Sequence, residues 1–241
     1  MTRLIQKTSL LIVLLSFLLS SNVNARFWSK KGNGNIQKEN REIASFSVIS
    51  ASMGINVYIV QGDKESLIVE TDENLLDNIT TRVKGNELII KIDGHFRRAT
   101  KLNVYVTLVD VYEINILSGA KVETRGALTT TNLDINISSG GFAKMEINAN
   151  DITCNTSSGA NALLTGKANY FSGEASSGSH LEAKELIAKV GQAKASGVAG
   201  VSLYASEAID ARASSFGYIN YYGHPEEVNT SDSNGGDVNR R

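Results

Sequence analysis

The acidic side chains are the residues with which this chain could carry out chemistry. Two carboxylates on neighbouring strands can bind Ca²⁺ or act as an acid and base pair on a glycosidic bond. Counted along the repeat described below, Asp134 and Glu174 are placed at one register, two repeats apart. The remaining carboxylates of this region form no ladder, and they are Glu123, Glu146, Asp151, Glu182 and Glu185. We therefore expect no catalytic site, no metal site and no cofactor.

Other nucleophiles and metal ligands are few. His95, His180 and His224 occur in unrelated contexts, without the spacing of a metal site. Cys154 is the only cysteine, so no internal disulfide can form, and its position in the repeat predicts a buried thiol. The many serines include no G-x-S-x-G motif. These features favour a protein that is not an enzyme.

Three tyrosines are candidates for ligand binding. Tyr204, Tyr218 and Tyr222 are predicted to face outward near the end of the repeats. Their rings could stack on the faces of sugars while their hydroxyl groups form hydrogen bonds. The same side chains could instead cover the open end of the fold and block edge pairing.

Basic residues form a second candidate binding surface. In the segment GHFRRATK, Arg97, Arg98 and Lys101 could contact a carboxylate or phosphate group, or else form a solvated loop tip. The chain of 241 residues carries 24 basic and 25 acidic side chains. Because nucleic-acid binding depends on a clear excess of Lys and Arg, we expect no nucleic-acid partner.

A recurring serine–glycine sequence indicates the elements that position these side chains. The glycines of this corner are Gly119, Gly140, Gly159 and Gly178, with spacings of 21, 19 and 19 residues. A fixed period near 20 is typical of a solenoid, whose repeats must stack to bury their apolar faces. Glycine turns the chain sharply at low cost, and the neighbouring serines are expected to bond to backbone groups of the turn.

Residues around each corner alternate as strands with one buried face do. Odd positions after the glycine are small or apolar, and even positions are mostly polar. The next two corners are placed at Gly200 and Phe216, with Ile219 and Tyr221 pointing inward. We predict a right-handed parallel β-helix-like solenoid of 19–21 residues per turn over residues 118–228. An all-β N-terminal region of alternating strands precedes it, over residues 43–117.

Residues 1–25 have the pattern of a signal peptide. Arg3 and Lys7 precede the apolar run LLIVLLSFLL, and small residues end at Ala25. The run is shorter than the ~20 residues of a membrane-spanning helix, so we expect an exported mature chain with no transmembrane segment. Residues 26–42 are expected to be a polar linker, and residues 229–241 a polar tail.

Several motifs together carry a family resemblance. SMGINVYIVQG, KGNELIIKI, VYVT and the SSG repeats resemble the auto-transporter adhesin, head GIN domain family of bacterial envelope proteins, over roughly residues 46–228. The resemblance implies an all-β fold related to β-helices, an exported location and a role in adhesion. It brings no catalytic residues to this chain.

These observations predict an exported, non-catalytic envelope protein in the periplasm, at the cell surface or in the medium. An adhesion or glycan-binding module, with a cell-surface glycan as partner, is the first hypothesis. A periplasmic structural protein that docks another envelope protein is the alternative. A polysaccharide-active enzyme is a third, which would need a cluster of carboxylates.

Overall fold

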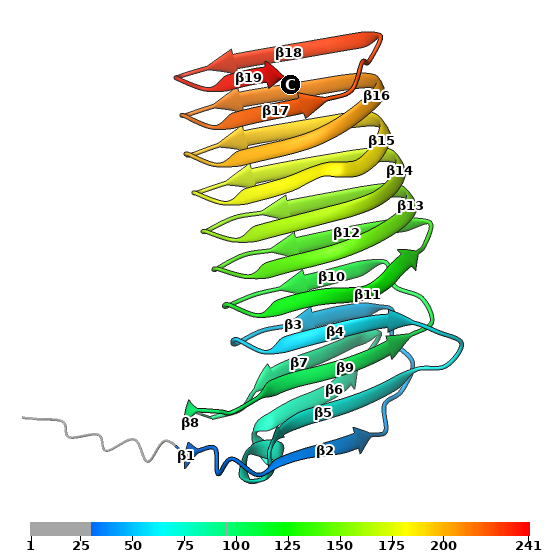
Figure 1. Ribbon diagram of the computed structural model, residues 1–241, viewed down its shortest axis with the longest axis vertical. Coiled ribbons are helices and arrows are strands. Elements are labelled where there is room, and N and C mark those ends of the chain that lie inside the picture. The colour runs from blue at the N-terminus through cyan, green and yellow to red at the C-terminus, as the bar shows by residue number, and fades with distance from the viewer. Residues whose placement is uncertain (1–29, 95) are drawn as a thin grey trace, which may run out of the picture.

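The protein is a stack of β-strands wound into a flattened coil. The computed structural model describes residues 30–94 and 96–241 (Figure 1). The predicted signal peptide and His95 lie outside the described residues. The elements are β1 (Lys30–Lys31), β2 (Ile36–Arg41), β3 (Val48–Ala51), β4 (Asn56–Gln61), β5 (Ser66–Asp72), the 3₁₀ helix η1 (Glu73–Asn78), β6 (Ile79–Lys84), β7 (Glu87–Ile92), β8 (Phe96–Arg98), β9 (Leu102–Leu108), β10 (Glu113–Ile116), β11 (Lys121–Thr129), β12 (Asn132–Ile137), β13 (Phe142–Thr156), β14 (Asn161–Ser176), β15 (His180–Ser196), β16 (Gly200–Ser214), β17 (Tyr218–Tyr222), β18 (Glu227–Ser233) and β19 (Asp237–Arg240).

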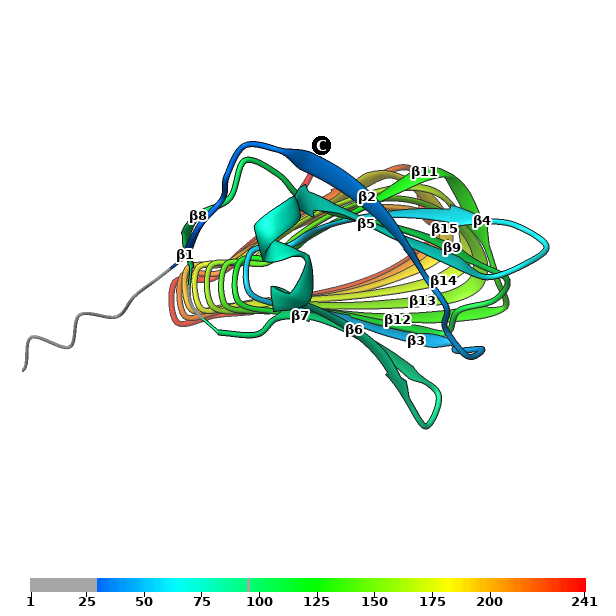
Figure 2. The same ribbon diagram turned by 90° about the horizontal axis from the view of Figure 1, so that it is seen from below.

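Parallel pairing between successive turns builds the coil. β13 pairs with β14 from Phe142 opposite Asn161 to Thr156 opposite Ala175, and β15 and β16 continue the stack. Each long strand covers one face, bends at the wide edge and returns along the other face (Figure 2). Seventeen strands belong to this one sheet. The predicted all-β solenoid is confirmed.

The serine–glycine corners are tight turns with two residues in the left-handed region. In each of the first four, serine has φ of 50–53° and the following glycine has φ of 70–74°. This pair of positive φ values is the type I′ pattern, which suits glycine at the second position. The turns lie in one column along the narrow edge, at the left in Figure 1.

Backbone hydrogen bonds join each of these turns to the next turn. Gly140 donates its N–H to the carbonyl of Ser158 at 3.1 Å, and Gly159 does so to Ser177 at 3.1 Å. These backbone hydrogen bonds hold the turns, rather than the hydrogen bonds that we expected from the serine hydroxyls of the SSG triplets. The corner predicted at Gly200 is also wrong, because Gly197 and Val198 have the positive φ values and Gly200 pairs with His180 inside a strand. Phe216, with φ of 62°, is a corner residue as predicted.

The core narrows toward the turns. Next to the turns the interior holds Ala120, Gly141, Ala160 and Ser179, whereas larger residues such as Phe171 lie deeper along the strands. A Cβ on Gly141 would lie 2.8 Å from the carbonyl oxygen of Ile116. Small residues at this edge therefore let the two faces approach each other.

The coil extends further toward the N-terminus than predicted. β3 and β4 form a rung with their own turn at Met53 and Gly54, and they pair in parallel with β10 and β11. β7 and β9 continue the stack below, where β5 and β6 pair antiparallel to them. The expected linker is corrected in part, since Ile36–Arg41 is strand β2, paired antiparallel with β5.

The last rung replaces the expected polar tail. β18 pairs with β16, and β19 pairs with β17. The inward positions of this rung are mixed: Val228 and Val238 lie opposite Ile209 and Ile219, whereas the charged Asp232 and Arg240 lie opposite Ala213 and Tyr221. Inward charges block further strand pairing, so this rung caps the coil. In the described part of the chain, no helix has the length and apolar character to cross a membrane.

Candidate functional site

A groove runs along the solenoid beside the column of turns. It encloses about 600 Å³ and crosses six rungs, from β12 to β18. Two columns of outward side chains line it, one of serines at the start of each turn and one of larger polar residues two positions earlier. We call it the serine groove, with a serine column of Ser138, Ser157, Ser176, Ser196, Ser214 and Ser233, and a second column of Asn136, Asn155, Glu174, Lys194, Arg212 and Ser231.

The repeat positions the serine column. Each serine is the first residue of its turn and follows an inward residue such as Thr156 or Ala175, so it faces outward. Leu117 occupies the same position one rung earlier and is 39% exposed. The backbone at this position therefore accepts leucine, and Leu117 lines the N-terminal end of the groove.

The second column is linked along the coil axis. The Asn136 amide donates to the Asn115 Oδ1 at 3.1 Å, and the Asn155 amide donates to the Asn136 Oδ1 at 3.1 Å. Lys194 Nζ lies 2.5 Å from Glu174 Oε1. Outside the groove lining, Asp210 accepts a 2.8 Å bond from Arg212. Amide and ion-pair contacts thus fix these side chains and balance their charges.

The serine hydroxyl groups face the groove and make no contacts of the kind that join the second column. Among the described residues, the hydroxyl groups of Ser138, Ser157 and Ser176 take no protein hydrogen bond, whereas the backbone of these residues pairs with neighbouring turns. Each hydroxyl can donate one bond and accept two. The groove therefore offers one free donor and acceptor group per rung.

The predicted tyrosines are brought together only in part. Tyr204 and Tyr222 are direct neighbours on β16 and β17, and with Ile187 and His224 they line a second depression of about 600 Å³. Tyr218 lies at the other end of β17, with its ring edge-on to His180 at 5.9 Å. These tyrosines precede the capping rung.

The predicted basic residues separate into two places. Arg97 and Arg98 are exposed on β8, where Arg98 pairs with Lys31 of β1. Lys101 instead places its ammonium 3.3 Å from Glu70 Oε1. Lys101 thus has a carboxylate partner within the protein, and anion contact by these three residues stays a prediction.

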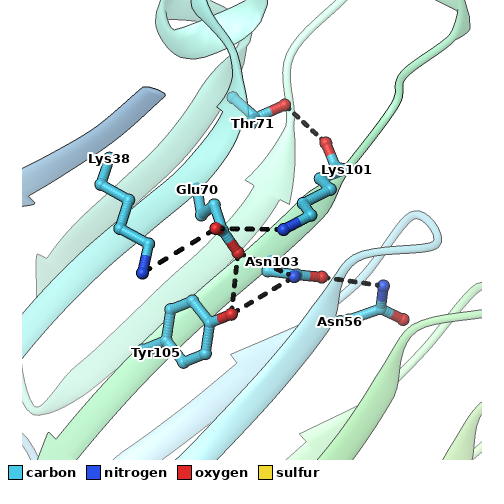
Figure 3. Close-up of polar contacts among 7 residues, drawn as sticks. All are labelled: Lys38, Asn56, Glu70, Thr71, Lys101, Asn103 and Tyr105. Atoms are coloured by element: carbon cyan, nitrogen blue, oxygen red, sulfur yellow. Dashed lines mark hydrogen bonds and ion pairs between the residues drawn. The ribbon is translucent and has the colours of Figure 1, made fainter. Parts of the chain in front are cut away.

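Glu70 is the centre of a polar cluster that sequence reasoning missed (Figure 3). Its buried carboxylate accepts hydrogen bonds from the Tyr105 hydroxyl at 2.8 Å, the Asn103 amide at 3.1 Å and Lys101 at 3.3 Å. Burial alone would raise the pKa of Glu70, but these three hydrogen bonds outweigh it and hold the pKa below its usual value. The Lys38 ammonium lies 3.9 Å away, so the cluster joins β2, β5 and β9.

Tyr105 connects this cluster to a cation on the surface. The Tyr58 and Tyr105 rings stack at 5.3 Å, and the Arg125 guanidinium lies 4.4 Å and 5.4 Å from their centroids. Because every group of the cluster has a partner within the protein, we interpret it as a structural clamp rather than a reactive site.

Asp72 makes a similar contact at the N-terminal end. Its buried carboxylate accepts bonds from the Gly34 N–H at 2.7 Å, the Thr100 N–H at 2.7 Å and the Thr100 hydroxyl at 2.9 Å. Burial alone would raise the pKa of Asp72, but these donors hold it below its usual value. Asp72 thus ties three chain segments together.

The groups considered for catalysis are not assembled. Asp134 lies in register with Thr153 and Ser172, so its placement at the register of Glu174 is wrong. Within residues 30–94 and 96–241, no three His, Cys, Asp or Glu side chains are grouped to hold a metal ion. Cys154 is fully buried, which raises the pKa of its thiol to about 12.

The groove residues were also missed from the sequence, although a signal for them exists. The SSG serines were interpreted only as turn residues. Asn115, Asn136 and Asn155 each lie four residues before a corner glycine, which is the periodicity of an outward column. Both columns are outward positions of the repeat, and this periodicity is the signal that could have identified them.

Comparison with protein families identifies the family of this chain. Residues 45–225 match the family described as "Putative auto-transporter adhesin, head GIN domain". The chain belongs to this family. The family is one of adhesin-like proteins, which favours an extracellular or envelope location. No curated protein matched the chain.

Solved structures share the fold. A protein from Bacteroides fragilis described as a putative adhesin is 24% identical, with a TM-score of 0.82, and covers 88% of this chain and 100% of its own. One from Parabacteroides distasonis, described as a putative lipid binding protein, is 21% identical with a TM-score of 0.74, over 88% and 99%. A putative adhesin from Parabacteroides merdae is 16% identical, with a TM-score of 0.70, over 88% and 99%. At these identities the likeness shows the fold alone.

Proposed function

We propose that the protein is a non-catalytic adhesion module that binds a polysaccharide in the serine groove. The observation that carries the proposal is the row of free serine hydroxyls across six rungs, beside a column of fixed polar side chains. Sugars present hydroxyl groups that donate and accept in the same way, so an elongated polar groove suits a glycan chain. Membership in an adhesin-like family supports the same role.

Filling the groove tests this proposal. Leucine at Ser157 or Ser176 would block the groove, and Leu117 shows that the backbone accepts leucine in this column. The control is Ser202→Leu, because Ser202 faces outward on β16 outside the groove lining. A polysaccharide array followed by titration calorimetry should show binding that Ser157→Leu and Ser176→Leu weaken about tenfold or more.

The outcomes separate the candidate surfaces. Equal binding by wild type and both groove variants would refute the serine groove as the site. Loss of binding in Tyr204→Ala and Tyr222→Ala instead would move the site to the tyrosine depression, where rings could stack on sugars. If no polysaccharide binds and cross-linking in cells captures one envelope protein, the protein is the docking component of our alternative hypothesis.

We further propose display at the cell surface. Adhesion requires contact with the outside, and the sequence pattern of residues 1–25 supports export. Protease treatment of intact cells should remove the protein while a periplasmic control protein survives. Survival of both would argue against an adhesive role.

A further inference from the structure

We propose that the ligand of the serine groove is a neutral, unbranched, β-linked polysaccharide, bound lengthwise with about one sugar ring per rung. This inference rests on the proposed function and names its ligand class. Neighbouring rungs of the coil are ~4.8 Å apart. The groove repeats the same polar groups at this interval, so it matches a ligand that also repeats at this interval.

Extended β-1,4-linked pyranose chains have such a repeat. Each ring is joined through bonds that point in opposite directions, so the chain is straight and advances by roughly one rung spacing per ring. Neighbouring rings are turned by about half a turn, so alternate hydroxyl groups of the chain face successive serines. An α-1,4-linked chain curves and would leave a straight groove after a few rings. Only the straight chain can place a hydroxyl group beside Ser138 and also beside Ser214, four rungs further along.

An extended peptide does not fit the same repeat. A β-strand advances ~3.3 Å per residue, which is shorter than the rung spacing. Residues of a peptide lying along the coil axis would therefore come into register with the serines only at about every third residue. A peptide also needs partners for its backbone N–H and C=O groups, and the serine hydroxyls occur only once per rung.

The charges of the groove favour a neutral chain. The cations in its lining, Lys194 and Arg212, are paired with Glu174 and Asp210 at 2.5 Å and 2.8 Å. The other rungs present the amides of Asn136 and Asn155, and serine hydroxyls. Each cation is thus already balanced by a carboxylate of the protein, so a uronic acid chain would meet little net positive charge, whereas neutral hydroxyl groups leave these exposed pairs intact.

The two ends of the groove differ. The apolar side chain of Leu117 lines its N-terminal end, whereas the last lining residues, Ser231 and Ser233, lie on the exposed capping rung. A long chain can therefore continue past the protein at the capping rung. Binding should grow with chain length until the six rungs are occupied.

Titration calorimetry with chains of increasing length tests this inference. The probes are cello-oligosaccharides and chito-oligosaccharides, with maltohexaose as the α-linked control and a β-1,4-linked mannuronate hexamer as the acidic control. We expect the affinity for one neutral β-linked series to rise about fivefold per ring, one hydrogen bond's typical contribution, and to level off near six rings. Both control sugars should bind at least about tenfold more weakly.

A groove-shortening variant sharpens the test. Ser214→Leu should interrupt the groove after Ser196 and lower the chain length at which affinity levels off. Affinity that does not change with length, or equal binding of maltohexaose or the mannuronate hexamer, would overturn the inference. Either result combined with loss of binding in Ser157→Leu would leave glycan binding by the groove intact, whereas no binding of any polysaccharide would refute the proposed function itself.

Discussion

The N-terminal cap, which consists of β2, β5, β6 and η1, and the repeats from β10 to β17 stabilise the same coil by different means. In the cap, β2 and β5 are fixed by buried carboxylates: Glu70 binds donors from β9, and Asp72 binds donors from residues 34 and 100. In the repeats, the turns bond to the next turns through backbone groups, and the interior is apolar or small. The cap therefore depends on a few specific side chains, and the repeats depend on a geometry that recurs.

This difference explains which surface residues can change without loss of the fold. A rung contacts only its neighbours, and its outward side chains take no part in the turn. The serine column can thus vary, as Leu117 shows, without loss of the coil. The cap has no such freedom, because each of its polar groups completes the hydrogen bonds of another.

Removing Asp72 should have the largest effect on stability. Asp72→Ala removes three hydrogen bonds to a charged acceptor and leaves the Gly34 N–H, the Thr100 N–H and the Thr100 hydroxyl without it, which should lower the free energy of unfolding by about 3 kcal/mol. Urea denaturation measures this change in the free energy of unfolding. Asp63→Ala, at an exposed turn, is the control and should stay within about 0.5 kcal/mol of wild type. A cost below about 1 kcal/mol for Asp72→Ala would show that the cap does not depend on this contact.

A corner substitution should have a smaller effect. Gly159 has φ of 70°, and no atom lies within 4 Å of a Cβ placed on it, so only backbone strain opposes a side chain. Gly159→Val should cost about 2 kcal/mol, because β-branched residues are poor in the left-handed region. Lys144→Ala, on the outer face of β13, should cost almost nothing. Equal costs would contradict the assignment of the corner.

The same contrast sets what the sequence could predict. A turn residue such as Gly140 recurs at a fixed period, so counting reveals the coil, the corners and the inward positions. Glu70 meets Tyr105 across 35 residues with no repeat to signal the pair, and β2 is polar on its surface, so it was predicted to be a linker. Gly200 was misplaced because the turn before it has glycine first and valine second. The groove was missed because the outer face of a repeat carries no requirement for folding.

Acid should weaken the cap selectively. The pKa values of Glu70 and Asp72 are lowered in the folded protein, so their stabilisation is complete above the unfolded values of about 4 and is lost as the pH falls through the folded values. In Glu70→Gln, stability at neutral pH should be lower by about 1 kcal/mol, and the decline from about pH 5 to about pH 3 should be shallower than in wild type. Parallel pH profiles of the two proteins would contradict the role of Glu70.

The smallest expected effect tests whether the N-terminal cap and the repeats unfold together. Cys154 is fully buried within the repeats, so alkylation of its thiol requires local opening of its rung. Gly159→Val lies in the adjoining turn and should raise the alkylation rate by about tenfold or more, measured by mass spectrometry under native conditions. Asp72→Ala should leave the rate within about twofold of wild type, because a weakened cap transmits little through rungs that contact only their neighbours. A rise in Asp72→Ala as large as in Gly159→Val would show instead that the whole coil opens as one cooperative unit, with the cap as its weakest part.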